Sequence, residues 1–234
     1  MNIIPATKLD SSQALRMIYG APGTGKTTAV TFLEGKTLLI DLDGSSKVLK
    51  GQPNIDVIPV ESTDVYHELG KMLGEIHDTL LDKYDHIVLD NLSELQRLTL
   101  SQMGESGNND GVPAQGDYQR MQFYIPRMLN YLRSWNKDVL VTAWEMTDQW
   151  TTMSGQVFDR AYPDINKKIL QRTMGLCNVV GRLVISQKTG ERVVALSPSD
   201  ELAAKNQLDK RKYCRVEDLF NGKEYKKQAI KGDK

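Results

Sequence analysis

Short apolar runs alternate with longer stretches of helical periodicity along most of the chain. The runs that we expect to form strands are 16–19, 37–40, 55–60, 86–89 and 139–143. Residues 86–89 are almost wholly apolar, which is typical of a strand buried on both faces of a sheet. Strands that alternate with helices in this way are typical of a parallel sheet covered by helices. The pattern therefore predicts an α/β fold.

Helical periodicity is clearest after residue 62, where apolar side chains recur on one face of a helix that we expect to reach residue 81. These side chains belong to Val65, Leu69, Leu73, Ile76 and Leu80. We expect Ser62 or Thr63 to cap the N-terminus of this helix. Further helices are expected over 26–33, 92–103, 118–135 and 167–174. The glycine-rich and asparagine-rich residues 104–116 predict a loop.

The last apolar runs have a different arrangement. Residues 179–185 and 192–196 are joined by the short polar link QKTGE, which predicts an antiparallel hairpin. No internal repeat or boundary divides the chain. We therefore expect one domain over residues 1–234, with a core at about 14–200 and a basic C-terminal segment at 205–234.

One motif in the chain carries specific chemistry. The sequence GAPGTGKT fits the phosphate-binding loop pattern G-x-x-x-x-G-K-[ST] in full, with a predicted strand before it and a helix after it. Glycines let backbone N–H groups turn toward a phosphate, and the positive end of the following helix faces the same anion. We expect Lys26 to neutralise the β and γ phosphates of ATP. The expected nucleotide-binding residues are Gly20, Ala21, Pro22, Gly23, Thr24, Gly25, Lys26, Thr27 and Thr28.

Two further acids complete the expected chemistry. The Thr27 hydroxyl and Asp90, which ends an apolar strand, are the expected magnesium ligands. Asn91 follows Asp90, so the Asp-Glu pair in which the glutamate activates water is missing. Asp43, after the second strand, is the best candidate for the catalytic base, because parallel strands bring their C-terminal ends to one edge of the sheet. The alternative for Asp43 is a turn residue or a helix cap.

The end of the strand at 139–143 should reach the same edge. Thr142, Trp144 or Glu145 could sense the γ-phosphate there, although packing is the stronger expectation for Trp144. Farther along, Trp150, Phe158 and Tyr162 offer ring faces on which bases of single-stranded DNA could stack; the alternative is that they pack onto the domain.

Composition narrows the class of protein. Of the 234 residues, 40% are hydrophobic and 26% are charged, as in an ordinary soluble globule. Lys plus Arg equals Asp plus Glu at 30 each, which argues against attachment to DNA or membrane by bulk charge. The two cysteines form no metal-ligand cluster, and no apolar run is long enough to span a membrane. These features lead us to expect a cytoplasmic protein.

The motifs resemble, in their order, those of RecA-like P-loop ATPases: GAPGTGKT, then LLIDLD, then HIVLDN. More narrowly, the chain resembles the small phage ATPases of the single-strand-annealing type, often described as phage nucleotide-binding proteins, over about residues 17–220. The resemblance implies a mostly parallel sheet flanked by helices, with a late antiparallel hairpin and with strand 139–143 between 16–19 and 86–89. It also implies DNA-facing loops at 104–116 and 149–163.

The resemblance further implies an assembly of identical subunits with ATP between them. In related enzymes, basic residues after the hairpin reach the ATP of the neighbouring subunit, and Lys205 and Arg211 are the candidates here. The P-loop region of the sequence has one lysine and no obvious arginine, which favours such a donated cation. The chain departs from the family at Gln207, where many relatives have an arginine.

Two classes of function follow. The first is an ATPase of DNA recombination that hydrolyses ATP with magnesium and anneals or pairs single-stranded DNA. The second is a loader or switch that docks to a replication protein under the control of ATP. A metabolic kinase is a third reading, although no second substrate site is visible. The expected partners are single-stranded DNA, further copies of the chain and a single-stranded-DNA-binding protein, in the cytoplasm of a bacterial host if a phage encodes the protein.

Overall fold

The computed structural model of the protein describes residues 5, 7, 13–61, 64–187 and 189–222. Within these residues a single ten-stranded sheet forms the centre of the molecule. Its strands are β1 Leu15–Gly20, β2 Thr37–Asp41, β3 Ile55–Pro59, β4 His86–Asp90, β5 Asp138–Thr151, β6 Val157–Pro163, β7 Val179–Ile185, β8 Arg192–Ala195, β9 Lys205–Asn206 and β10 Tyr213–Arg215. The helices are α1 Val65–Glu75, α2 Leu92–Glu105, α3 Gln115–Arg133 and α4 Lys167–Leu176.

The order of the strands is β10-β8-β7-β1-β5-β4-β2-β3. The pairs from β7 through β1, β5, β4 and β2 to β3 are all parallel. At the other end β7 and β8 form the antiparallel hairpin that the sequence predicts. Because β5 lies between β1 and β4, the sheet has the order that the resemblance to RecA-like ATPases implies. The expected α/β fold is confirmed.

Alternate residues of the central strands face two different hydrophobic clusters. Met17 and Tyr19 of β1 face the cluster that includes the buried sides of α1, α2, α3 and α4. Ile18, between them, faces the cluster on the other side, which is covered by short 3-10 turns and the C-terminal strands. The sheet is thus buried on both faces, as the apolar strands predict. No helix among the described residues is long and apolar enough to cross a membrane.

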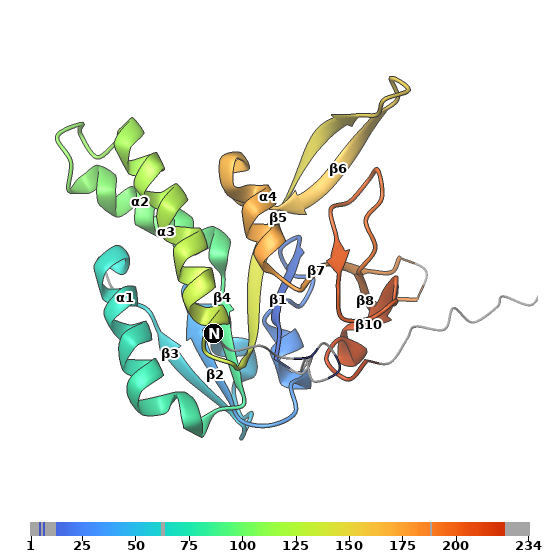
Figure 1. Cartoon of the computed structure of the whole chain (residues 1–234), viewed down its shortest axis with the longest axis horizontal. Helices are drawn as coiled ribbons and strands as arrows, with labels where there is room; N and C mark the ends of the chain where they lie inside the picture. Colours follow the sequence, from blue (N-terminus) through green and yellow to red (C-terminus); the bar gives the residue numbers. More distant parts are fainter. Residues whose placement is uncertain (1–4, 6, 8–12, 62–63, 188, 223–234) are drawn as a thin grey trace, which may run out of the picture.

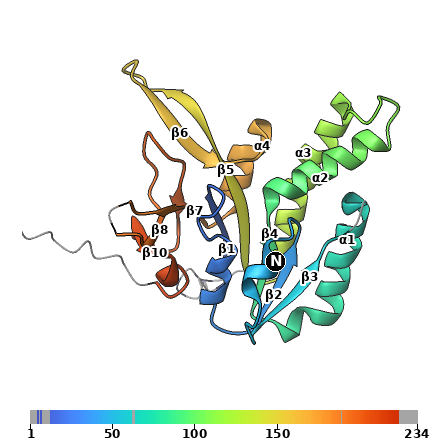
Figure 2. The same ribbon diagram turned by 180° about the vertical axis from the view of Figure 1, so that it is seen from behind.

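The segment at 149–163 is the largest departure from the predicted elements. It was expected to be a loop, but β5 continues to Thr151 and pairs with β6 in an antiparallel ribbon. Its threonine, valine and aromatic residues favour strands, and Gly155, with a φ of 83°, permits the tight turn between them. Figures 1 and 2 show this ribbon extending beyond the other strands of the sheet.

Two helix predictions need correction. The helix after the P-loop is only a 3-10 segment, η2 (Thr28–Phe32), because the β-branched residues crowded there disfavour an α-helix. The long helix after residue 62 begins at Val65, and its cap is Asp64, whose side chain accepts the backbone N–H of His67. Ser62 and Thr63, the expected caps, lie outside the described residues. This helix then continues as a π-helical turn, η4 (Ile76–Leu80).

The remaining elements agree more closely with the expectations. The helices α2, α3 and α4 match the predicted ones within three residues at each end, and α3 contains Pro126. Residues 106–114 link α2 to α3 as the predicted loop. In the basic C-terminal segment, the described residues include β9, β10 and the short turn η6 (Val216–Asp218). β9 pairs with β7, and β10 pairs with β8 at the edge of the sheet.

Candidate functional site

The phosphate-binding loop leaves β1 at Gly20 and turns sharply twice. Gly23 and Gly25 have φ values of 79° and 97°, which glycine adopts more easily than any other residue. At Gly20 a Cβ atom would lie 2.5 Å from the carbonyl oxygen of Leu183 in β7. The motif glycines are thus required by backbone conformation at two positions and by close packing against the hairpin at the third.

Lys26 lies across the loop. Its Nζ donates hydrogen bonds to the carbonyl oxygens of Gly20 (2.9 Å) and Ala21 (3.1 Å), and only 8% of the residue is exposed. Burial lowers the pKa of Lys26, while the nearby carboxylates of Asp90, Asp43 and Glu145 oppose this shift. A lysine held in this way is already placed beside the space that the loop encloses.

The carboxylate of Asp90 lies at the centre of the site. One oxygen accepts hydrogen bonds from the hydroxyls of Thr27 (2.6 Å) and Ser45 (3.1 Å), and the other accepts one from Thr142. Asp90 is 1% exposed, and burial raises the pKa of its carboxyl group despite these donors. Four elements that are distant in sequence therefore meet on one acid.

These oxygen atoms fit a magnesium ion of the P-loop type. Magnesium in such sites is held by one or two protein side chains and by the phosphates of the substrate, not by a cage of protein ligands. Accordingly, the described residues contain no cluster of three or more acids, histidines and cysteines. Thr27 and Asp90, the two expected ligands, are in direct contact.

Asp43 reaches the same edge, as its position after β2 predicts. One oxygen of the Asp43 carboxylate accepts a hydrogen bond from the side-chain amide of Asn91, and the other accepts the backbone N–H of Ser45 at 3.0 Å. The turn that carries Asp43 is itself shaped by the buried Asp41, which accepts the N–H groups of Gly44, Ser45 and Ser46. Asp43 is exposed, so a water molecule can reach it.

The three candidates at the end of the predicted fifth strand have different surroundings. Thr142 contacts Asp90, as described above. Trp144 packs against Arg97, whose guanidinium carbon lies 4.4 Å from the centre of the indole ring. Glu145 forms a bidentate ion pair with Arg182 of β7, with N–O distances of 2.9 and 2.7 Å. Of the three, only Glu145 forms an ion pair among the described residues.

Sequence reasoning missed several residues that the fold brings to this site. Ser45 lies two residues after Asp43, in a segment where only Asp43 was considered as a site residue, and it contacts both Thr27 and Asp90. Arg182 and Arg192 belong to the hairpin, more than 150 residues beyond the P-loop. The Nε atom of Arg192 donates to the carbonyl oxygen of Thr24, at 3.0 Å. No local pattern marks these two arginines, because only the pairing of β7 with β1 places them here.

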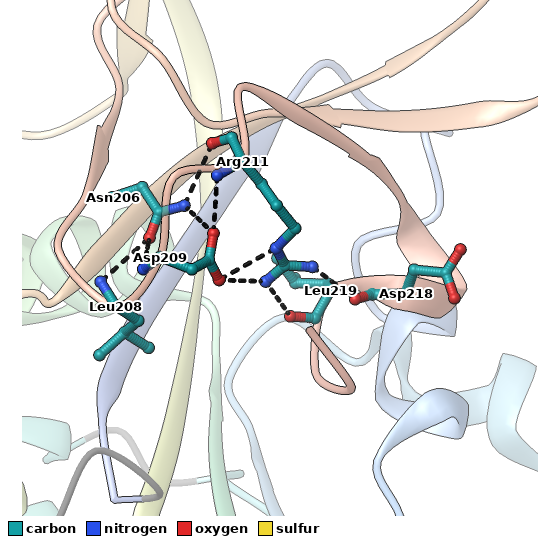
Figure 3. Close-up of polar contacts among 6 residues, drawn as sticks. All are labelled: Asn206, Leu208, Asp209, Arg211, Asp218 and Leu219. Atoms are coloured by element: carbon teal, nitrogen blue, oxygen red, sulfur yellow. Dashed lines mark hydrogen bonds and ion pairs between the residues drawn. The ribbon is translucent and has the colours of Figure 1, made fainter. Parts of the chain in front are cut away.

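Lys205 and Arg211 have partners within their own chain. Lys205 Nζ donates to the carbonyl oxygens at the end of α4, those of Gly175 (2.8 Å) and Cys177 (2.6 Å) among them. Figure 3 shows Arg211 paired with Asp209 and bonded to two backbone carbonyls of the following turn. Their role toward a neighbouring subunit stays a prediction.

The three aromatic residues of the ribbon differ in exposure. Trp150 is 44% exposed, with the guanidinium carbon of Arg160 4.8 Å from the centre of its ring. Phe158, opposite Trp150 in the ribbon, is half-buried. Tyr162 is buried, and its hydroxyl donates to Asp148. Trp150 is therefore the ring that is open to a planar ligand.

Comparison with known proteins agrees with this geometry. Residues 13–208 match a family described as an AAA domain. No curated protein matches the chain in sequence. Among solved structures, the crystal structure of the RadB recombinase is similar, with 18% sequence identity, 78% of this chain and 79% of that chain covered, and a TM-score of 0.47. Because the family match spans most of the described residues and includes the complete loop GAPGTGKT, the chain belongs to the AAA-domain family of P-loop nucleotide-binding proteins.

Proposed function

We propose that this protein binds ATP together with magnesium and hydrolyses it. The observation that carries the proposal is the contact of the Thr27 hydroxyl with Asp90, directly beside Lys26. Lys26 and the N–H groups of the loop bind the phosphates, while Thr27 and Asp90 hold the metal, which neutralises charge that develops on the phosphate oxygens.

The same proposal needs a group that takes a proton from water. Asp43 serves as this base, because it is exposed and lies beside the metal-binding residues. The hydrogen bond from Asn91 orients its carboxylate. Glu145 is the second candidate, but its carboxylate already accepts two hydrogen bonds from Arg182 and is less available as a base.

We further propose that single-stranded DNA is the partner and that the protein acts in recombination, by annealing or strand pairing. The exposed ring of Trp150, stacked with Arg160, combines a flat face with a positive charge. Proteins bind single strands without sequence preference through this combination. The resemblance to phage annealing ATPases points the same way.

A second candidate function is a loader or switch that docks to a replication protein. The tip of the ribbon favours it, because Met153 is fully exposed and Val157 is 59% exposed. Exposed apolar side chains are typical of surfaces that bind another protein. A single-stranded-DNA-binding protein would be the partner.

We propose that the active form is an assembly of identical subunits in which Lys205 or Arg211 reaches the ATP of a neighbour. Both side chains hold carbonyl groups of their own chain in the single subunit. The arrangement therefore requires that one of them be released when subunits meet. A cation supplied in this way raises turnover by ~10³–10⁵ in other NTPases.

Replacing Lys26 with alanine should abolish hydrolysis and weaken nucleotide binding, because the main positive charge on the triphosphate is lost. The measurement is release of phosphate from ATP, with nucleotide binding followed in parallel. Lys36→Ala is the matched control, since Lys36 is half-exposed and pairs with Asp56. Wild-type turnover by Lys26→Ala would contradict the proposed site.

Asp43→Asn and Asp90→Asn should fail in different ways. Asp43→Asn should still bind ATP, but turnover should fall by ~10²–10⁴-fold, as is typical for loss of a general base. Asp90→Asn should raise the magnesium concentration needed for half-maximal activity. If Asp43→Asn hydrolyses ATP normally, the base is assigned wrongly, and Glu145→Gln becomes the variant to measure.

Single-stranded DNA should stimulate ATP turnover, and Trp150→Ala should raise the DNA concentration needed for half-maximal stimulation by about tenfold, because stacking contributes ~1–3 kcal/mol per base. Phe123→Ala is the control, since Phe123 is 73% exposed on α3. Stimulation by a single-stranded-DNA-binding protein but not by DNA would favour the loader instead.

Mixing Lys26→Ala with Lys205→Ala protein should restore part of the activity that each variant lacks alone, at sites that pair an intact P-loop with an intact Lys205. Thermal melting of Lys205→Ala checks that loss of its bonds to α4 leaves the fold intact. The same mixture made with Arg211→Ala tests the second candidate. If both mixtures remain inactive, neither residue acts across subunits.

A further inference from the structure

The hairpin of β7 and β8 contacts the P-loop at two points. The carbonyl oxygen of Leu183 approaches Gly20 so closely that no side chain fits there. Farther along the loop, Arg192 Nε donates to the carbonyl oxygen of Thr24. The first contact is made by backbone alone, whereas the second brings a full positive charge to the loop.

Arg192 also lies directly against Gly25, the glycine that precedes Lys26. A Cβ atom on Gly25 would lie 2.7 Å from Arg192 Nε and 3.1 Å from its Cδ. Gly25 therefore lacks a side chain for two reasons: its φ of 97° and the guanidinium stem that fills the space. The arginine is packed at the turn from which N–H groups bind a phosphate.

Most N–H groups of Arg192 have no partner within the part of the chain that the structure describes. A guanidinium has five N–H donors, and only the one on Nε has a partner among the described residues. Arg192 is exposed and takes part in no ion pair there, whereas the next arginine along the edge, Arg215, pairs with Glu191 at 2.7 Å. Because Arg192 is exposed, these four further donors are accessible to a ligand.

Among the residues that the structure describes, the carboxylates near the loop form no ion pair with Arg192 either. Asp90, Asp43 and Glu145 are the acids that act on Lys26, and Glu145 is already paired with Arg182. A phosphate chain carries several negative charges, and arginine binds phosphate oxygens through paired N–H groups. The unused donors of Arg192 match that chemistry.

We propose that Arg192 is a nucleotide-binding residue that acts within its own chain: Nε holds the loop at Thr24, and the remaining N–H groups bind phosphate oxygens of the nucleotide. The proposal rests on the proposed nucleotide site. The sequence around the P-loop contains no obvious arginine, so the sequence alone did not indicate this residue.

The test compares the affinity for ADP of the full-length protein and three variants, in the presence of magnesium. Arg192→Gln keeps an N–H group for Thr24 but loses the charge, and should bind ADP about tenfold or more weakly, because hydrogen bonds to charged groups contribute ~1.5–3 kcal/mol. Arg192→Lys keeps the charge and should retain more affinity than Arg192→Gln. Arg215→Gln, the matched control, should bind as the wild type does.

Comparing the ADP affinities of Arg192→Gln and Arg192→Lys distinguishes phosphate binding from support of the loop. Equal affinities of Arg192→Gln and the wild type would overturn the proposal and leave only support of the loop at Thr24, the hydrogen bond that glutamine can keep. Equal losses in Arg192→Gln and Arg192→Lys would also overturn it, because the positive charge at this position would then make no difference to affinity. Wild-type protein that binds ADP but does not hydrolyse ATP would contradict the proposed ATPase function and leave this inference intact.

Mixing variants tests that Arg192 acts within one chain. Arg192→Gln mixed with Lys26→Ala should show no more turnover than the two proteins measured separately, because no subunit then has both residues. Activity restored in this mixture would place Arg192 at the neighbouring subunit's nucleotide and overturn the proposal.

Discussion

The whole site depends on one buried carboxylate, that of Asp90. Its cost of burial is offset by three hydroxyl donors, which come from the P-loop, the turn after β2 and the middle of β5. If the parallel strands were in a different order, these donors would not meet. The order of the strands therefore also determines which side chains surround Asp90.

The sequence was sufficient to predict the central sheet and the edge at which Lys26, Asp43 and Asp90 meet, because these residues follow buried strands; their roles in binding and catalysis stay predictions. Lys26 lies inside a complete motif. Asp90 ends β4 and Asp43 follows β2, and the carboxyl ends of these two parallel strands must share an edge. The hairpin arginines could not be predicted, since their relation to the loop arises from strand pairing across the whole chain. The ribbon was missed because polar residues on its exposed faces hide the strand pattern.

The base of the ribbon and the residues that precede Lys205 act as a second support for the nucleotide loop. Tyr19, which directly precedes the loop, is buried, and its hydroxyl lies 2.6 Å from the carbonyl oxygen of Ala203 and 3.1 Å from that of Ala161. The loop is thus tied to the base of the ribbon and to the segment that leads to Lys205. Both regions are therefore linked through Tyr19 to the phosphate-binding loop, although they are distant from it in sequence.

The continuity of β5 also limits how the chain can change in length. Thr142 beside Asp90 and Trp150 on the ribbon belong to one uninterrupted strand, in which successive side chains alternate between faces. Removing or adding a single residue between them would turn one of the two to the opposite face. Residues at the tip of the ribbon, beyond the last paired positions, are under no such restriction. Natural or engineered variants can therefore lengthen the tip freely, whereas the stretch that joins it to Asp90 must keep its length.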